Sequence, residues 1–213
     1  MRKLTGNLDS IAEQIRRDFS TKDAAREKVL PLCRDAIRCC SQAIRAVHRQ
    51  EFAQAAESLK SARSLLAEVE KAVAAHSELS NTGFVRDAQK EFAEGSILLA
   101  LVTGKRLPDP GELGIAAAAY LNGLGEAVGE LRRYLLDGMR RGDLSRSEEI
   151  LLVMDDIYNV LVTMDFPDAI TGGLRRTTDM VRGVLERTRS DLTLVMRQKD
   201  LENKLEKFKD DLR

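Results

Sequence analysis

The segment LPLCRDAIRCCSQAIRAV, residues 30–47, places apolar side chains at alternating intervals of three and four residues. The repeating positions are Leu30, Cys33, Ile37, Cys40, Ile44 and Val47. Because an α-helix completes a turn in about 3.6 residues, these side chains form one stripe along a helix. The stripe predicts a long helix packed lengthwise against others. Pro31 lies within it, and an internal proline removes a helical hydrogen bond, so we expect a kink or break between residues 20 and 31.

Five further helices are predicted by the same periodicity together with start and stop signals. Asp109, Pro110 and Glu112 form one start signal: a capping residue, a proline at the first helical position and a capping-box partner. The expected helices cover approximately residues 51–76, 82–103, 110–141, 146–166 and 174 to the C-terminus. No segment is interpreted as a strand. The sequence therefore predicts an all-α fold, a bundle of six to seven long helices in a single domain, residues 1–213.

The composition agrees with a helical intracellular protein. Aromatic residues make up only 4% of the 213 residues, there is no tryptophan, and charged residues make up 32%. No apolar run reaches the roughly 18 residues that a membrane span needs. The first 19 residues are charged throughout and lack the apolar core of a signal peptide. The three cysteines are too few and too clustered for a disulfide framework, which favours a cytoplasmic protein without a membrane partner.

Charge is unevenly distributed, although the formal net charge is zero. Residues 1–50 contain 11 Lys and Arg against 6 Asp and Glu, whereas the other 163 residues contain 23 against 28. Any nucleic-acid site should therefore be local. Four arginines flank the apolar stripe at intervals of four, seven and four residues: Arg34, Arg38, Arg45 and Arg49. They are candidates for phosphate contacts, or they form an ordinary charged flank bonded to neighbouring acids or to another subunit.

Two pairs of glutamates have spacings that place each pair on one helix face. Glu91 and Glu94 are three residues apart, and Glu126 and Glu130 are four residues apart on the next helix. On facing helices, such pairs could hold Mg²⁺ or Mn²⁺, which prefer carboxylate oxygens. With 34 acidic residues in the chain, such pairs also arise by chance, mostly on solvated surface. Arg133, three residues after Glu130, could contact a phosphate or pair with a glutamate.

Three glycines surround Glu126 in the sequence: Gly123, Gly125 and Gly129. Each glycine inside a helix costs about 1 kcal/mol relative to alanine. Tertiary structure must offset this cost, either through the close approach of another helix or by giving a ligand access to the backbone. Either explanation places this stretch near the centre of the bundle.

Histidine-based metal chemistry is not predicted. A ferritin-like di-iron site needs a glutamate followed three residues later by a histidine. His48 and His76 are the only histidines, and at that spacing they follow Arg45 and Val73. Two histidines also leave little room for a zinc site or for histidine-based catalysis.

Three stretches of the chain together resemble the translin/TRAX superfamily, most closely its archaeal TRAX-like members. The first is REKVLPLCRDAIRCCSQAIRAVHRQEF, residues 26–52. The second is FVRDAQKEFAEGSILLALVTGKRLP, residues 84–108, which contains an E-x-x-E motif. The third begins with YLNGLGEAVGELRRYLLDGMRRGD, residues 120–143, and continues to residue 192. The resemblance implies a translin-like bundle of seven mostly antiparallel helices that assembles into hollow, barrel-like octamers.

The resemblance also implies a particular site, because TRAX supplies a Mg²⁺-dependent endoribonuclease centre that faces the cavity. The family's E-x-x-E motif falls on Glu91 and Glu94, and its D-x-x-x-E motif falls on Glu126 and Glu130. Glu126 departs from the family's Asp, and its longer side chain could shift the ion and favour Mn²⁺. These four glutamates are the predicted catalytic and metal-binding residues, with Mg²⁺ as the cofactor and Mn²⁺ as the alternative.

The predicted function is a metal-dependent endoribonuclease that binds and cleaves single-stranded RNA inside a homo-oligomeric barrel, with single-stranded DNA as a second candidate substrate. The residues predicted to guide RNA are Arg34, Arg38, Arg45, Arg49 and Arg133. The main alternative is a non-catalytic oligomer of translin type that binds single-stranded nucleic acid without turnover. A third class, a purely structural helical oligomer or adaptor, is compatible with the zero net charge.

Overall fold

The structure is a computed structural model that describes residues 5–211, so residues 1–4 and 212–213 of the predicted domain lie outside the described residues. Within this range all regular secondary structure is helical, which confirms the predicted all-α class. The six long helices are α1 (Leu8–His48), α2 (Phe52–Val73), α4 (Gly83–Val102), α6 (Ala117–Arg140), α7 (Ser147–Val162) and α9 (Leu174–Asp211). The single-turn helices are α3 (Ser77–Ser80), α5 (Pro110–Leu113) and α8 (Asp168–Thr171). No helix in the described range is long and apolar enough to cross a membrane.

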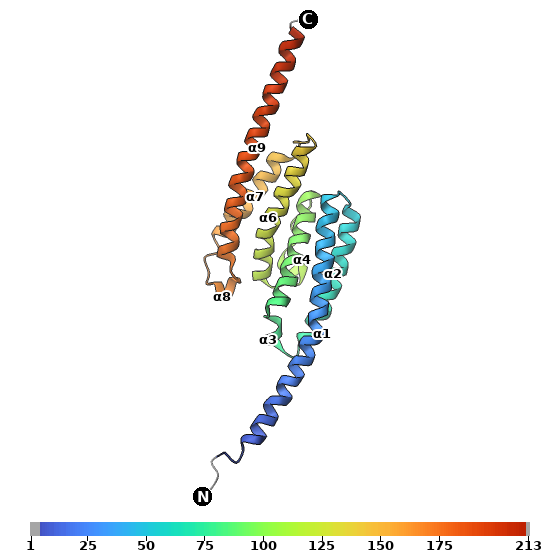
Figure 1. Cartoon of the computed structure of the whole chain (residues 1–213), viewed down its shortest axis with the longest axis vertical. Helices are drawn as coiled ribbons and strands as arrows, with labels where there is room; N and C mark the ends of the chain where they lie inside the picture. Colours follow the sequence, from blue (N-terminus) through green and yellow to red (C-terminus); the bar gives the residue numbers. More distant parts are fainter. Residues whose placement is uncertain (1–4, 212–213) are drawn as a thin grey trace.

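The helix α1 runs unbroken through Pro31, so the expected break is wrong. Figure 1 shows only a gentle bend in this part of the helix. Side chains are buried on both sides of the proline, at Val29 and Cys33, and the predicted stripe continues into the core through Cys40 and Val47. Burial of these apolar side chains offsets the hydrogen bond that Pro31 cannot donate.

The helix predicted over residues 110–141 is divided in two. The capping box at its start is present, because the side chains of Asp109 and Glu112 each accept a hydrogen bond from the other residue's backbone N–H. It begins α5, which ends after one turn where Gly114 adopts a φ of 69°. Glycine adopts this left-handed conformation without the steric cost that a Cβ imposes. The long helix α6 then begins at Ala117.

The helices α4 and α6 lie at the centre of the bundle and join its two halves. Figure 1 shows α1 and α2 on one side of α4, with α6, α7 and α9 on the other. The helix α4 packs against α1, α2 and α6, and α6 packs in turn against α7 and α9. Ile97 and Leu98 of α4 and Leu131 of α6 are fully buried in one continuous core. Side chains on the facing surfaces of α4 and α6 are therefore held in a defined position by packing.

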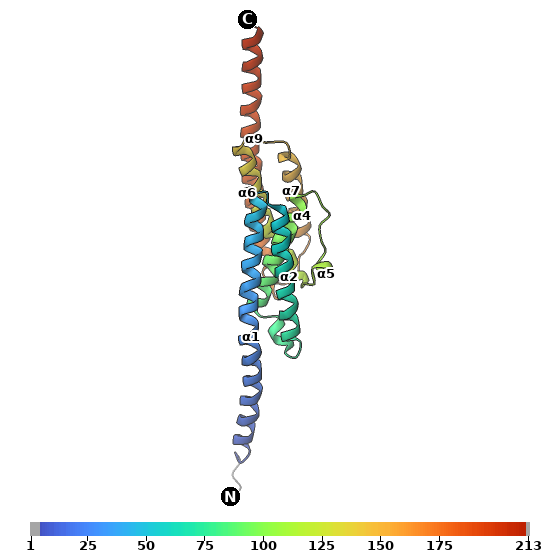
Figure 2. The same cartoon turned by 90° about the vertical axis from the view of Figure 1, so that its right-hand side faces the viewer.

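The N-terminal part of α1 and the C-terminal part of α9 extend beyond the bundle in opposite directions, as Figures 1 and 2 show. Both segments carry large apolar side chains that are mostly exposed: Leu8, Ile11, Ile15 and Phe19 on α1, and Leu201, Leu205 and Phe208 on α9. Apolar stripes of this kind are typical of helices that pack against another chain. The homo-oligomer stays a prediction, for which these two segments offer candidate interfaces.

Two of the three glycines around Glu126 are explained by close helix packing. A Cβ added at Gly123 would lie 2.6 Å from the Cβ of Ala93 and 2.6 Å from the carbonyl oxygen of Lys90, both on α4. A Cβ at Gly125 would clash with the side chain of Thr177 on α9. Gly129 differs, because a Cβ there would meet no atom within 4 Å. The contact at Gly123 brings the backbones of α4 and α6 together beside the predicted site.

We expect opposite effects from alanine at two of these glycines. Gly123→Ala should lower the free energy of unfolding by about 1–3 kcal/mol, because α4 and α6 must separate to accommodate the methyl group. Gly129→Ala should raise it by up to about 1 kcal/mol, because alanine favours the helix and the methyl group enters open space. Urea unfolding of the two variants and the wild type measures both effects. Equal destabilisation by both substitutions would contradict the assigned α4–α6 contact.

Candidate metal centre

Three of the four predicted glutamates converge between α4 and α6. One carboxylate oxygen each from Glu91, Glu94 and Glu126 can be chosen so that all three lie within 4.8 Å of one another. The three-residue spacing on α4 places Glu91 and Glu94 on one face. Glu126 follows Gly123 by about one turn of α6, so the close helix contact brings its carboxylate to that face. We call these three residues the carboxylate cluster.

Burial and mutual repulsion disfavour full ionisation of the carboxylate cluster. The side chain of Glu94 is buried, and this burial, together with the charges of neighbouring glutamates, raises its pKa to about 8. Burial also raises the pKa of Glu91, and the nearby charge of Glu126 adds to the effect. Charged carboxylates that lose water need a compensating proton or cation. The carboxylate cluster is therefore electrostatically suited to a divalent cation.

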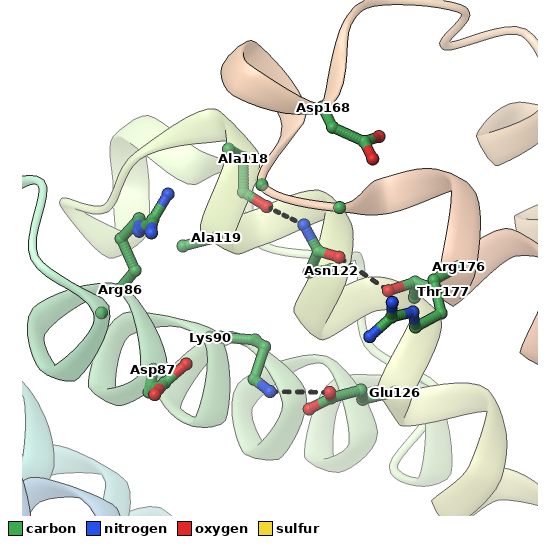
Figure 3. Close-up of a pocket in the computed structure, with 13 residues that line it drawn as sticks. Arg86, Asp87, Lys90, Ala118, Ala119, Asn122, Glu126, Asp168, Arg176 and Thr177 are labelled. Atoms are coloured by element: carbon green, nitrogen blue, oxygen red, sulfur yellow. Dashed lines mark hydrogen bonds and ion pairs between the residues drawn. The ribbon is translucent and has the colours of Figure 1, made fainter.

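Lys90 already compensates one charge of the carboxylate cluster. Its Nζ donates a hydrogen bond to Oε1 of Glu126 at 2.7 Å, as Figure 3 shows. Burial lowers the pKa of Lys90, but the hydrogen bond and the charge of Glu126 outweigh this effect and raise it overall. The ammonium group therefore stays protonated beside the cluster. Glu91 and Glu94 make no comparable ion pair within 4 Å among residues 5–211.

The fourth predicted glutamate, Glu130, lies outside the cluster of three. Its Oε2 accepts a hydrogen bond from Nε2 of His48 at 2.5 Å, and Nη1 of Arg133 lies 3.7 Å from the same oxygen. The hydrogen bond from His48 is the main cause of the lowered pKa of Glu130. Glu130 is thus ionised and already held by a cationic or hydrogen-bonding partner next to the cluster.

His48 is a site residue that sequence reasoning missed. It ends α1, its side chain is only 6% exposed, and its Nδ1 is buried without a hydrogen-bond partner. No local spacing motif marks it, because its partner Glu130 is 82 residues away in the sequence. In the sequence, burial of His48 is indicated only by its position at the end of the apolar stripe, next to Val47.

The four arginines predicted on the first helix are all exposed; three lie on α1, and Arg49 directly follows its last residue. Arg38 lies 3.1 Å from Asp35, and Arg49 lies 2.9 Å from Glu51, as the charged-flank interpretation expects. Arg34 and Arg45 make no ion pair within 4 Å with any of the described residues. A role of these side chains in nucleic-acid binding stays a prediction.

Solved structures of other proteins are similar to this chain in fold, and some also in sequence. The structure of an AfC3PO–duplex RNA complex matches with a TM-score of 0.78 and 33% identity, over 88% of this chain and 97% of that one. A crystal structure of AfC3PO matches with a TM-score of 0.77 over the same shares and with the same identity. Apo-NeC3PO, at 16% identity, shares the fold with a TM-score of 0.75 over 91% of this chain and 99% of that one.

The chain is also similar to the uncharacterized protein MJ0175 of Methanocaldococcus jannaschii, with 29% identity over 198 residues, 89% of this chain and 84% of that protein. No protein-family model matches the chain. The fold and the site define a helical-bundle protein with glutamates gathered between its two central helices. The chain belongs to the translin/TRAX family, as the similarity to the C3PO proteins shows.

The raised pKa of Glu94 predicts a pH-dependent stability. Its carboxyl keeps a proton up to about pH 8 in the folded chain but ionises near its ordinary value of 4.5 in the unfolded chain. The folded state therefore binds more protons between these values, and stability falls as the pH rises from about 5 to 8. Glu94→Gln should remove this dependence, with a gain over wild type that grows by roughly 2–4 kcal/mol across that range.

Urea unfolding in EDTA between pH 5 and pH 9 measures the effect of Glu94→Gln. Glu68→Gln on α2 is the matched control, since Glu68 is exposed and does not belong to the carboxylate cluster. A constant difference between Glu94→Gln and wild type at all pH values would show that Glu94 does not carry the buried proton.

The hydrogen bond between His48 and Glu130 should contribute measurably to stability. Each single substitution, His48→Gln or Glu130→Gln, is expected to cost about 1–3 kcal/mol, because it leaves a poorly solvated partner. A double-mutant cycle measured by urea unfolding at pH 7 should give a coupling energy of about 1–2 kcal/mol. Arg133→Gln is the control, and its cost should stay below about 0.5 kcal/mol because Arg133 is exposed. Simple additivity of the two substitutions is the result that contradicts the pairing.

Proposed function

We propose that this protein is a metal-dependent endoribonuclease in which Glu91, Glu94 and Glu126 hold Mg²⁺ or Mn²⁺. The observation that carries the proposal is the convergence of three partly buried carboxylates from two helices on one point. Two of them have raised pKa values because of burial and mutual repulsion. AfC3PO, which is 33% identical to this chain, forms a complex with duplex RNA. This supports RNA as the substrate class.

The donor set of the carboxylate cluster fits a hard divalent cation. All three donors are carboxylate oxygens, which suit Mg²⁺ and Mn²⁺ better than the softer metals that bind imidazole and thiolate. Three protein ligands leave positions open for water and for a substrate oxygen, as catalytic sites for Mg²⁺ require. The partly buried environment strengthens the attraction between the carboxylates and a cation.

A bound cation would polarise a phosphate oxygen and lower the pKa of a bound water molecule. The residues of this chain have separate roles around it. Glu130, kept ionised by His48, lies beside the cluster with a free carboxylate oxygen that can accept a proton or a hydrogen bond from water. Lys90 holds the carboxylate of Glu126 and limits its rotation. In the net reaction, the oxygen of water bonds to phosphorus, the bond from phosphorus to a ribose oxygen breaks, and a proton from the water ends on that ribose oxygen, which leaves as a hydroxyl group.

We propose single-stranded RNA as the substrate and a homo-oligomeric barrel as the working assembly, following the resemblance to TRAX. The exposed apolar segments of α1 and α9 support self-association. The duplex RNA bound by AfC3PO makes double-stranded RNA the first comparison substrate. Single-stranded DNA is the second, because the carboxylate cluster would act on a phosphate that both nucleic acids contain.

A second candidate is a non-catalytic oligomer that binds nucleic acid. Two observations favour it: Glu126 is already paired with Lys90, and Glu130 with His48. In that case the glutamates belong to a structural ion-pair network between helices, and RNA binding proceeds without turnover. The presence or absence of shorter products in the assay below separates the two functions.

Glutamine substitutions in the carboxylate cluster should abolish cleavage. Glu91→Gln and Glu126→Gln are each expected to reduce the cleavage rate by about 100-fold or more, since metal ligation contributes several kcal/mol to the transition state. The assay follows end-labelled single-stranded RNA, duplex RNA and single-stranded DNA on denaturing gels with Mg²⁺, Mn²⁺ or EDTA. Glu68→Gln should cleave like wild type. Equal rates in Glu91→Gln, Glu126→Gln and Glu68→Gln would reject the assignment, and binding without products in wild type would favour the non-catalytic function.

A further inference from the structure

A polar cavity of about 360 Å³ opens directly beside the carboxylate cluster. It lies between α4, α6, α8 and the start of α9, and Glu126 belongs both to its lining and to the cluster. Figure 3 shows the residues that line it. Sites for small organic ligands begin at about 300 Å³, so the cavity is large enough for one nucleotide unit.

Two arginines reach the cavity from opposite sides. Arg86 comes from α4 and Arg176 from α9, and Figure 3 shows Asn122 lying between them. Neither guanidinium group lies within 4 Å of a carboxylate among residues 5–211, although Lys90, which also lines the cavity, is paired with Glu126. The two arginines therefore present ten N–H donors, five each, without an acidic partner.

The acidic residues of the cavity do not neutralise these arginines. Asp87 and Asp168 are exposed, and Figure 3 places them at different edges of the group. Glu126 is engaged by Lys90 at 2.7 Å. Two guanidinium groups thus remain available to a ligand between these edges.

The wall between the arginines is rigid. The amide of Asn122 is buried; its Nδ2 donates to the carbonyl oxygens of Ala118 and Thr171, and its Oδ1 accepts from the hydroxyl of Thr177. These bonds tie α6 to α8 and to the start of α9. Gly172, between α8 and α9, adopts a φ of 65°, a left-handed backbone conformation that glycine takes without steric cost. The wall of the cavity is therefore held in place by hydrogen bonds of the chain itself.

We propose that this cavity binds a phosphate group of the RNA strand through Arg86 and Arg176, next to the phosphate that faces the carboxylate cluster. Guanidinium groups bind phosphate through two parallel hydrogen bonds, and two of them on facing walls fix its position. The location next to the cluster rests on the proposed function, whereas the binding itself does not. The phosphate is either an internal phosphodiester or a terminal phosphate, which share this chemistry.

The test is binding of a 12-nucleotide RNA, labelled at its 3′ end, by fluorescence anisotropy in EDTA between 50 and 300 mM salt. One version of the strand carries a 5′-phosphate and the other a 5′-hydroxyl. The variants are Arg86→Gln, Arg176→Gln and the double substitution in the full chain. Arg175→Gln is the matched control, because Arg175 neighbours Arg176 but contacts Asp165 and does not line the cavity.

The double variant should bind at least about tenfold more weakly than wild type, with the slope of log affinity against log salt reduced by about 0.7 per lost phosphate contact. Arg175→Gln should stay within about twofold of wild type. Weakening confined to the 5′-phosphate strand identifies a terminal phosphate, and equal weakening of both strands identifies an internal one. Binding of both strands by the double variant within threefold of Arg175→Gln, at an unchanged salt slope, would overturn the proposal.

Unfolding midpoints establish that the variants fold. Arg176→Gln alone provides a second test, because the side chain of Arg176 is exposed and makes no ion pair within residues 5–211, so its replacement should leave folding unchanged. Cleavage by Glu126→Gln separates this proposal from the proposed function. If Glu126→Gln cleaves RNA at the wild-type rate, the proposed nuclease centre is rejected, but the binding results for the arginine variants still test the cavity. If cleavage depends on Glu126 and the double arginine variant binds RNA as tightly as wild type, only the proposal of phosphate binding in the cavity is rejected.

Discussion

The close contact between α4 and α6 at Gly123 is the constraint on which the site depends. The backbone of α6 approaches Ala93 and the carbonyl oxygen of Lys90 so closely that a single methyl group at Gly123 would collide with both. Glu94 follows Ala93 directly, and Glu126 lies about one turn beyond Gly123. The contact therefore sets the separation of the carboxylates. A bundle with these two helices even slightly further apart would keep the fold and lose the carboxylate cluster.

The same contact brings negatively charged glutamates close together, which is electrostatically unfavourable. Other side chains of the protein balance the charge of some of these glutamates and not of others. Lys90 neutralises Glu126, and His48 holds Glu130 through a hydrogen bond that lowers the pKa of that glutamate. Within the described part of the chain, Glu91 and Glu94 have no such partner, and their pKa values are raised by burial and by neighbouring charges. The uncompensated pair lies on α4, within one turn of the helix contact. A divalent cation would thus be attracted most strongly to the α4 side of the site.

Local patterns could be predicted from the sequence, whereas long-range partners could not. The apolar stripe beginning at Leu30 and the spacing of Glu91 and Glu94 depend on positions within one helix, where the 3.6-residue period is decisive. The unbroken helix at Pro31 depends on core packing that outweighs a lost hydrogen bond. The pairing of His48 with a glutamate 82 residues away depends on how α1 lies against α6, and no spacing within the chain encodes it.

The order of groups along α6 suggests how the two proposals fit together. Asn122, Glu126 and Glu130 recur every four residues, about 6 Å apart along the helix axis, and so lie near one face. The first supports the wall of the arginine cavity, the second belongs to both the cavity and the carboxylate cluster, and the third meets His48 at the end of α1. An RNA strand that follows this face would meet cationic groups, then carboxylates that hold a cation, then Arg133. The carboxylates of the cluster would repel the phosphates of RNA unless they held a cation. A metal ion at the cluster would therefore be required for RNA to bind along this face as well as for cleavage.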